Sequence, residues 1–196
     1  VLERLRQPME DGIVTISRAA GTVSYPAHFL LIAASNPCPC GWFGSDTKPC
    51  RCLPGQISKY QKRVSGPILD RIDIHMDVPA VKIEKLVSKQ KVDESSKSIR
   101  QRVQTARNKQ KMRFKKTIFV ANAEMGTKSV KEFCQLTVEC QRLLTAAASQ
   151  LNLSARSYYR VIKVARTIAD LEGEKAIRSN HIAEALQYRP KQENLL

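Results

Sequence analysis

The sequence lacks several features that would assign it to a common class of protein. Its longest uninterrupted apolar run is the six residues 29–34, whereas a membrane-spanning helix needs about 20. It opens with no leader of the secretory type, and it contains only 18 acidic residues against 33 Lys and Arg. We therefore expect a cytoplasmic protein with no membrane partner. The resulting net charge of +15 indicates a polyanionic partner, most simply nucleic acid.

The start of the chain also lacks an initiator methionine, because the first residue is Val1. Residues 1–7 already read as the middle of a helix, so we expect the chain to be a piece of a longer protein. Its 196 residues, 42% of them hydrophobic, suffice for one domain or two small ones with a packed core.

Four of the six cysteines form a C-x-C…C-x-C pattern with nine residues between the two pairs. They are Cys38, Cys40, Cys50 and Cys52. The surrounding segment is rich in Pro and Gly and has no regular core of its own, and a tetrahedral zinc ion bound by four thiolates would supply the missing stability. We predict a structural zinc site, with free thiols or disulfides as the alternatives. Cys134 and Cys140 lie in a helical stretch and are expected to be buried thiols.

The N-terminal part of the chain reads as α/β structure. Residues 13–16 and 22–25 are rich in β-branched residues and flank a turn, which predicts a β-hairpin with Arg18 near its tip. The apolar run 28–35 is typical of a strand buried on both faces of a parallel sheet. It ends at Asn36, and such sheets place ligand-facing residues at strand ends. Downstream we expect a helix over 58–64, then a short helix and a strand over 68–78.

The C-terminal part reads as a bundle of helices. Its first segment, 97–116, has nine basic and no acidic residues, with an apolar stripe at Ile99, Val103 and Ala106. Such a charge run is either a solvated helix face or a nucleic-acid contact. The candidate contacts are Arg100, Arg107, Lys111 and Lys115, together with Arg18 of the hairpin. Apolar periodicity predicts further helices over 129–136, 138–150, 154–171 and 179–188, with Ser154 as an N-cap.

Several stretches resemble one family in the same order along the chain. They are LRQPMEDGIVTISRA (5–19), SNPCPCG (35–41), SGPILDRIDIHMDVP (65–79), LSARSYYRVIKVARTIADLEG (153–173) and HIAEALQYR (181–189). The chain resembles the C-terminal part of a magnesium-chelatase-like AAA+ ATPase of the ComM/YifB type. The resemblance implies an α/β fold class, the C-terminal part of an AAA+ P-loop core with a β-hairpin insert, followed by an all-α helical lid. The implied boundaries are 1–80 for the core with its Cys loop 38–52, 81–96 for a linker or short helix, 97–190 for the lid of the magnesium-chelatase C-terminal type, and 191–196 for a tail.

The resemblance also assigns roles to three residues. Asn36 matches sensor 1, whose amide can position the attacking water near the γ-phosphate. Arg71 matches the arginine finger, and Arg156 matches sensor 2. The alternative for Asn36 is a polar cap at a strand–loop junction, for Arg71 a local ion pair with Asp70 or Asp73, and for Arg156 a solvated helix face. The resemblance places Arg18 in a pre-sensor hairpin that can reach nucleic acid in the pore of a ring.

The implied function is ATP hydrolysis with Mg²⁺ by a self-associated ring, a hexamer, that works on DNA as a competence or recombination helicase in branch migration. The family's Walker A and Walker B sequences would precede Val1, and the chain contains no Gly-rich phosphate loop. We therefore expect the chain alone to be inactive as an ATPase. Two alternatives remain: an ATPase subunit of a metal chelatase, and a zinc-stabilised DNA-binding module without catalysis. The three histidines are isolated, and none is assigned to a metal.

Overall fold

The computed structural model describes residues 2–79, 81 and 94–190. They fall into two compact units: the first holds the chain up to Ile72, and the second holds Asp73–Asp77 and the helices that follow. The expected linker or short helix over 81–96 lies mostly outside the described residues, and the expected tail lies wholly outside them. Among the helices described, none combines the length and the apolar character needed to cross a membrane.

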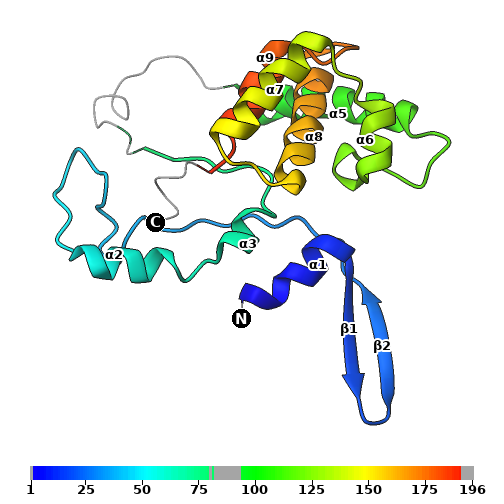
Figure 1. The fold of residues 1–196 in the computed structure, drawn as a ribbon. Helices are drawn as coiled ribbons and strands as arrows, with labels where there is room; N and C mark the ends of the chain where they lie inside the picture. Colours follow the sequence, from blue (N-terminus) through cyan, green and yellow to red (C-terminus); the bar gives the residue numbers. More distant parts are fainter. Residues whose placement is uncertain (1, 80, 82–93, 191–196) are drawn as a thin grey trace. The chain divides into compact units, whose positions relative to one another are not determined.

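The first unit begins with a short helical segment that leads into a β-hairpin (Figure 1). The 3₁₀ helix η1 (Leu2–Leu5) continues into α1 (Arg6–Asp11), which ends at Gly12 in the left-handed conformation with φ of 65°. A Cβ at Gly12 would stand only 2.7 Å from the ring of His28, so this position requires glycine on two counts. Strand β1 (Ile13–Arg18) then pairs antiparallel with β2 (Gly21–Pro26). Arg18 faces Gly21 in the last pair before the turn, which confirms the predicted hairpin and its tip.

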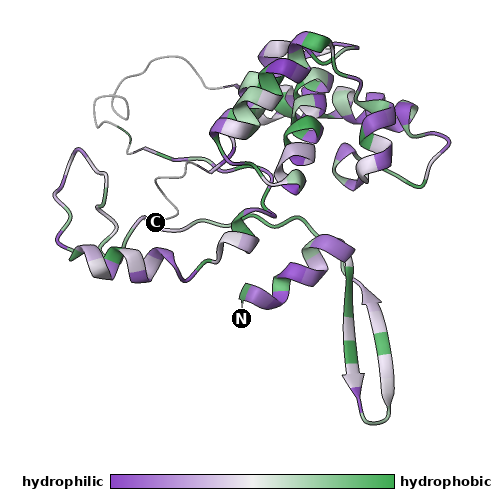
Figure 2. Cartoon of the chain, viewed as in Figure 1, coloured by the Kyte–Doolittle hydropathy of each residue, from purple (hydrophilic) through white to green (hydrophobic). Residues whose placement is uncertain are grey.

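The two faces of the hairpin differ in polarity because side chains alternate along a strand. On one face hydroxyl groups pair across the strands at 3.0 Å, Thr15 with Ser24 and Ser17 with Thr22. The other face carries exposed apolar side chains, and Figure 2 shows apolar residues on both strands. They are Val14, Ile16, Val23 and Tyr25.

Two expected strands are wrong. Residues 28–35 form no strand, and Leu30 and Ile32 are 83% and 84% exposed. Residues 73–78, after the short helix α3 (Gly66–Leu69), likewise form no strand, although the N–H of His75 donates to the carbonyl of Tyr188 at 2.9 Å. A strand exists only where a neighbour completes its ladder of hydrogen bonds. In the described part of the chain the only sheet is the β1–β2 pair, so these apolar runs have no strand beside them.

Helix α2 (Pro54–Gln61) overlaps the helix expected over 58–64, but it begins four residues earlier and ends three residues earlier. Pro54 occupies the first helical position, where its missing N–H costs nothing. The backbone N–H of Leu53 donates to Oε1 of Gln56 at 3.1 Å, which ties down the first turn.

The second unit is an all-helical bundle, as the apolar periodicity predicts (Figure 1). Its elements are α5 (Ser96–Arg113), η2 (Asn122–Glu124), α6 (Thr127–Phe133), α7 (Val138–Gln150), α8 (Ala155–Glu172) and α9 (Ser179–Gln187). The side chains of Ser95, Thr137 and Ser154 each accept a backbone N–H at the start of a helix, and the predicted Ser154 cap is thereby confirmed. Gly173 ends α8 in the left-handed conformation, as is common for C-terminal caps.

Helix α8 supplies the centre of the core of this unit, packing against both α9 and α5. Val161, Ile162 and Ala165 of α8 are buried together with Leu144 of α7 and Ile182 of α9. Cys134 and Cys140 belong to the same core, which confirms them as buried thiols. In α5, however, the predicted stripe is wrong in part: Ala106 is buried, but Ile99 and Val103 remain 42% and 45% exposed.

A polar cluster is enclosed within this bundle. Asp170 of α8 pairs with Arg113 of α5 and, at 3.1 Å, with Arg166 on its own helix. Nδ2 of Asn122 donates to Asp170 at 2.9 Å, and Nη1 of Arg113 donates to Oδ1 of Asn122 at 2.8 Å. Nη1 and Nη2 of Arg166 also donate to the backbone carbonyl oxygens of 175 and 174, both at 2.7 Å, while its buried Nε has no hydrogen-bond partner among the described residues. Buried charges are stable only when they are paired in this way, so the cluster fixes α5 against α8.

Candidate functional site

Asn36 lies where the extended run ends and the Cys loop begins. The side chain of Asn36 lies beside Gly41, since a Cβ built there would be 3.8 Å from Cγ and Nδ2 of Asn36. Gly41 has φ of 81°, a conformation that glycine adopts without strain. The next carbonyl, of Pro37, accepts a hydrogen bond from Nε2 of Gln61 at 3.1 Å. Asn36 thus sits at a junction anchored to α2 on one side and to the Cys loop on the other.

The four cysteines of the loop come together, as their spacing predicts. Their sulfur atoms all lie within 4.8 Å of one another, and all four are free thiols. Backbone N–H groups of Arg51 and Trp42 donate to Cys40 and lower the pKa of its thiol to about 6. Burial, in contrast, raises the pKa of Cys134 in the helical core to about 11. Within the loop the pKa of Cys38 is lowered as well, whereas the pKa of Cys50 is raised to about 12 and that of Cys52 is raised, so the loop favours thiolates at two of its four cysteines.

Arg71 is held by the N-terminal helix of its own unit. Its Nε donates to Oε2 of Glu10 at 3.0 Å, its Nη2 pairs with the same carboxylate, and its Nη1 donates to the carbonyl of Pro67 at 2.8 Å. The Arg71 side chain is 10% exposed. The alternative pairing of Arg71 with Asp73 is wrong, because Asp73 pairs with Arg160. Sequence reasoning missed Glu10, which lies 61 residues from Arg71 and carries no local signal for this contact.

Helix α8 presents three basic residues along one face, at spacings of four and three. Arg156 stands in the first turn and is exposed. Arg160 pairs with Asp73, and Nζ of Lys163 donates to the carbonyl of Ala123 at 2.8 Å. Burial and the neighbouring charge of Arg160 lower the pKa of Lys163. Arg160 and Lys163 thus contact acceptors of the protein, and Arg156 is exposed on the same face.

The basic helix α5 divides into two stripes. Arg100, Arg107 and Lys111 follow one another at spacings of seven and four, which places them on one helical face. All three are exposed, and none forms an ion pair with another described residue. We call these three residues the outward stripe. Lys115, just beyond the end of α5, is exposed as well.

The opposite face of α5 holds a second stripe of basic residues, at Arg102, Lys109 and Arg113. Arg113 pairs with Asp170, and Nζ of Lys109 would lie 3.4 Å from a Cβ at Gly173, the C-terminal cap of α8. Arg102, in contrast, is exposed and pairs with Glu94 just before the helix at 2.9 Å, so Arg113 and Lys109 are the members of this stripe that face α8. Only part of the charge in segment 97–116 is therefore available to an external partner.

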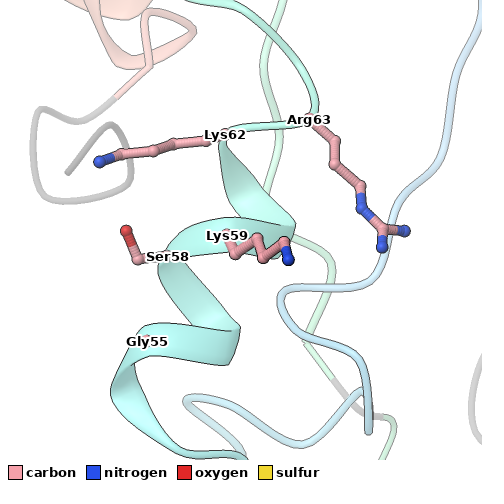
Figure 3. A pocket seen from close by; sticks show the side chains of 5 residues that line it. All are labelled: Gly55, Ser58, Lys59, Lys62 and Arg63. Carbon is pink, nitrogen blue, oxygen red and sulfur yellow. The ribbon is translucent and has the colours of Figure 1, made fainter.

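A further group of basic residues, not predicted as a site, lines a shallow depression on α2 (Figure 3). Lys59, Lys62 and Arg63 surround it together with Gly55 and Ser58. In Figure 3 the Lys62 and Arg63 side chains project in different directions and do not converge on one point. The signal in the sequence was the cluster of cations near the end of the predicted helix.

The chain matches two family models placed end to end. The model described as magnesium chelatase, subunit ChlI, covers residues 1–86. The model described as magnesium chelatase, subunit ChlI C-terminal, covers residues 93–189. The boundary between the two matches falls close to the start of α5.

Curated relatives match over almost the whole chain. It is 41% identical over 189 residues to the competence protein ComM of Haemophilus influenzae, and 39% identical over 189 residues to the protein YifB of Escherichia coli. A protein of Mycobacterium bovis, Mb2921c, is 32% identical over 188 residues. The match covers 96% of this chain in each case, but only 36% of the length of ComM or YifB and 37% of Mb2921c. The chain thus spans about a third of the length of these relatives.

Proposed function

The chain belongs to the magnesium-chelatase-like proteins of the ComM/YifB type, and from this premise we propose that it is the C-terminal part of an AAA+ ATPase that acts on DNA. In this proposal the first unit is the end of the ATPase core and the second unit is its helical lid. The parts that hold the phosphates, and with them Mg²⁺, belong to the preceding sequence of a longer protein. The isolated chain accordingly hydrolyses no ATP.

Three residues of the chain complete the proposed nucleotide site. The amide of Asn36 orients the attacking water. Arg71 of one subunit reaches the ATP of its neighbour in a ring, a hexamer, and stabilises the charge of the transferring phosphoryl group. Arg156 contacts the same phosphates from the lid. Its exposed place in the first turn of α8 supports this role, because a cation there opposes the helix dipole and gains from a nearby anion.

The pairing of Arg71 with Glu10 affects how Arg71 would act as an arginine finger. The Arg71 guanidinium donates from Nε and Nη2 to one oxygen of Glu10, which orients it, and its side chain is largely buried. It can exchange that partner for a phosphate of comparable geometry. Glu10 would then hold Arg71 in position while no nucleotide of a neighbouring subunit is in reach.

DNA is the proposed substrate of the motor. The observation that carries this part is the outward stripe, three exposed cations on one face of α5 without an acidic partner in the described residues. Such a stripe can follow a phosphate backbone without reading its sequence. Arg18, at the exposed tip of the hairpin, supplies a second contact. The competence role in the name of one relative fits a motor that remodels DNA by branch migration.

Mixing two inactive variants of the longer protein tests the shared nucleotide site. Asn36→Ala removes the amide from the subunit's own nucleotide site, whereas Arg71→Ala removes the guanidinium from the nucleotide site of the neighbouring subunit. Each variant alone is expected to lose ATP turnover. In mixed rings about one quarter of the interfaces combine an intact Asn36 with an intact Arg71, so turnover should return in part. If the mixture stays as inactive as the two variants alone, Arg71 does not act across a subunit interface.

A second candidate is an ATPase subunit of a metal chelatase, which the descriptions of both family models favour. The two candidates share the nucleotide chemistry and differ in the macromolecule or cofactor that stimulates it. DNA should raise the ATP turnover of a DNA motor, and a porphyrin with its partner subunits should raise that of a chelatase. The outward stripe favours the first.

A further inference from the structure

We propose that Cys38, Cys40, Cys50 and Cys52 bind one structural zinc ion. The site does not depend on the proposed ATPase or DNA function, because its ligands and its test concern metal binding alone. The ion would be the fixed centre of the loop that follows Asn36.

The distances between the sulfur atoms carry the proposal. Sγ of Cys38 lies 3.4 Å from that of Cys40 and 3.7 Å from that of Cys50, and the Cys40 and Cys50 sulfurs are 3.6 Å apart. Cys52 completes the group, with all four sulfurs within 4.8 Å of one another. A tetrahedral zinc ion with Zn–S bonds of about 2.3 Å needs edges of about 3.8 Å between its sulfurs. Three of the sulfurs therefore already stand close to the corners of such a tetrahedron, and the sulfur of Cys52 lies within 4.8 Å of each of them.

The same distances argue against the two alternatives for this loop. A disulfide needs its sulfurs about 2.0 Å apart, and the shortest separation here is 3.4 Å. Four thiols without a metal would be stabilised little by lying in contact with one another, since S–H groups are weak hydrogen-bond donors and acceptors. A shared soft cation accounts for the convergence, and zinc is the metal that closed tetrathiolate sites of cytosolic proteins most often hold.

The surroundings of Cys38 suit a metal-bound thiolate. The backbone N–H of Phe43 donates to Sγ of Cys38 at 3.3 Å, and Cys38 is fully buried. Hydrogen bonds of this kind orient metal ligands and offset their charge. Four thiolates and one Zn²⁺ leave two negative charges, and the loop contains two cations, Lys48 and Arg51, and one carboxylate, Asp46. Nζ of Lys48 lies over the ring of Trp42, 4.7 Å from its centroid.

The loop needs such a centre because it has no helix or strand between Asn36 and Pro54. Its own hydrogen bonds are few, such as that from the N–H of Gly41 to the carbonyl of Cys38 at 3.0 Å. A metal that joins two Cys-x-Cys turns would fix Gly41 and so the surface against which Asn36 rests. The zinc site thus positions the junction that ends the extended run.

The direct test is the metal content of the chain purified without chelator, measured by mass spectrometry of the elements. One equivalent of zinc is expected in the chain, and less than about half an equivalent in the Cys40→Ser and Cys50→Ser variants. The control variants Cys134→Ala and Cys140→Ala, which alter buried thiols outside the loop, should keep one equivalent. A wild-type content below about half an equivalent, or a normal content in Cys40→Ser, would overturn the site.

Cobalt substitution reports the coordination itself. The chain loaded with Co²⁺ should show the intense visible absorption of a tetrahedral cobalt thiolate, and the spectrum should vanish on addition of one equivalent of zinc. A weak, octahedral type of spectrum would contradict the proposal. Trypsin supplies a readout of local order, since the bond after Arg51 should be protected in the metal-bound chain and cleaved after a mercurial reagent displaces the metal. Equal cleavage in both states would show that no ion orders the loop.

Discussion

Arg113 and Asp170 stand 57 residues apart in the sequence and form an ion pair inside the helical bundle. Asp170 is fully buried, and Arg113 is the last residue of the most basic helix. This pair shows that the cations of segment 97–116 differ in their surroundings. Arg113 ties α5 to α8, whereas Arg100, Arg107 and Lys111 of the outward stripe are exposed.

Asp170→Asn is expected to destabilise the helical unit strongly. The substitution leaves the buried guanidinium groups of Arg113 and Arg166 without a counter-charge, and breaking a buried pair costs about 3–5 kcal/mol. Urea denaturation followed by circular dichroism measures the loss. Arg107→Ala is the matched control, because the removal of an exposed cation should change the free energy of unfolding by less than about 0.5 kcal/mol. Equal stability of the two variants would contradict the structural role of the Asp170 cluster.

The same carboxylate predicts a dependence of stability on acid pH. Burial raises the pKa of Asp170, but hydrogen bonds from Arg113 and Asn122 outweigh it, and the net pKa is lowered. A group with a lowered pKa contributes stability above its unfolded value, about 3.9 for aspartate, and loses it as the pH falls through the folded value. Unfolding curves between neutral pH and pH values of about 3 should therefore fall more steeply for wild type than for Asp170→Asn. Parallel curves would show that Asp170 titrates normally.

Removal of the outward stripe should weaken DNA binding and its response to salt. The triple variant Arg100→Ala, Arg107→Ala and Lys111→Ala loses up to three phosphate contacts. The slope of log K against log salt should therefore shrink by roughly 2–3. Fluorescence anisotropy with labelled double-stranded DNA gives both quantities.

The matched control for the stripe removes the same charge elsewhere. Lys128, Lys131 and Arg142 are exposed on α6 and α7, and their triple alanine variant should keep most of the affinity and the slope. Equal losses in the two variants would mean that net charge, rather than the stripe, attracts DNA. No binding by wild type at low salt would remove the DNA part of the proposal altogether.

Arg156→Ala should impair the ATP response of the longer protein without unfolding the lid. Arg156 is exposed, so its removal leaves the core intact, whereas Arg160→Ala deletes the ion pair with Asp73 and should lower stability modestly. Steady-state ATP turnover and thermal unfolding, measured side by side, separate the two effects. Normal turnover in Arg156→Ala would refute the sensor role.

The sequence predicts the helical unit well because each helix carries its own signals. The apolar spacing in α7 and α8 and the caps at Thr137 and Ser154 are local, and the bundle needs only the chain's own residues to bury them. The run 28–35 shows the opposite case, since its apolar pattern is that of a buried strand, yet no other strand of the described residues pairs with it. Hydrophobicity indicates that a segment is to be buried, but the hydrogen bonds that make it a β-strand depend on a neighbouring strand.

The candidate site divides in the same way. The spacing of Cys38, Cys40, Cys50 and Cys52 predicts their convergence, because all four lie on one short loop. The hydrogen bonds between Arg71 and Glu10 could not be predicted, since no local sequence pattern relates two residues so far apart in the sequence. Which cations of α5 face the bundle depends on where Asp170 of α8 lies, and the sequence of α5 alone does not give that position.

The most direct test of the account is ATP-dependent unwinding of a branched DNA substrate by the longer protein that contains this chain. The account predicts unwinding with ATP and Mg²⁺, little or none in the Arg71→Ala variant, and reduced unwinding when the outward stripe is removed. Robust ATP hydrolysis that DNA does not stimulate, together with no strand separation on any branched substrate, would contradict a DNA motor.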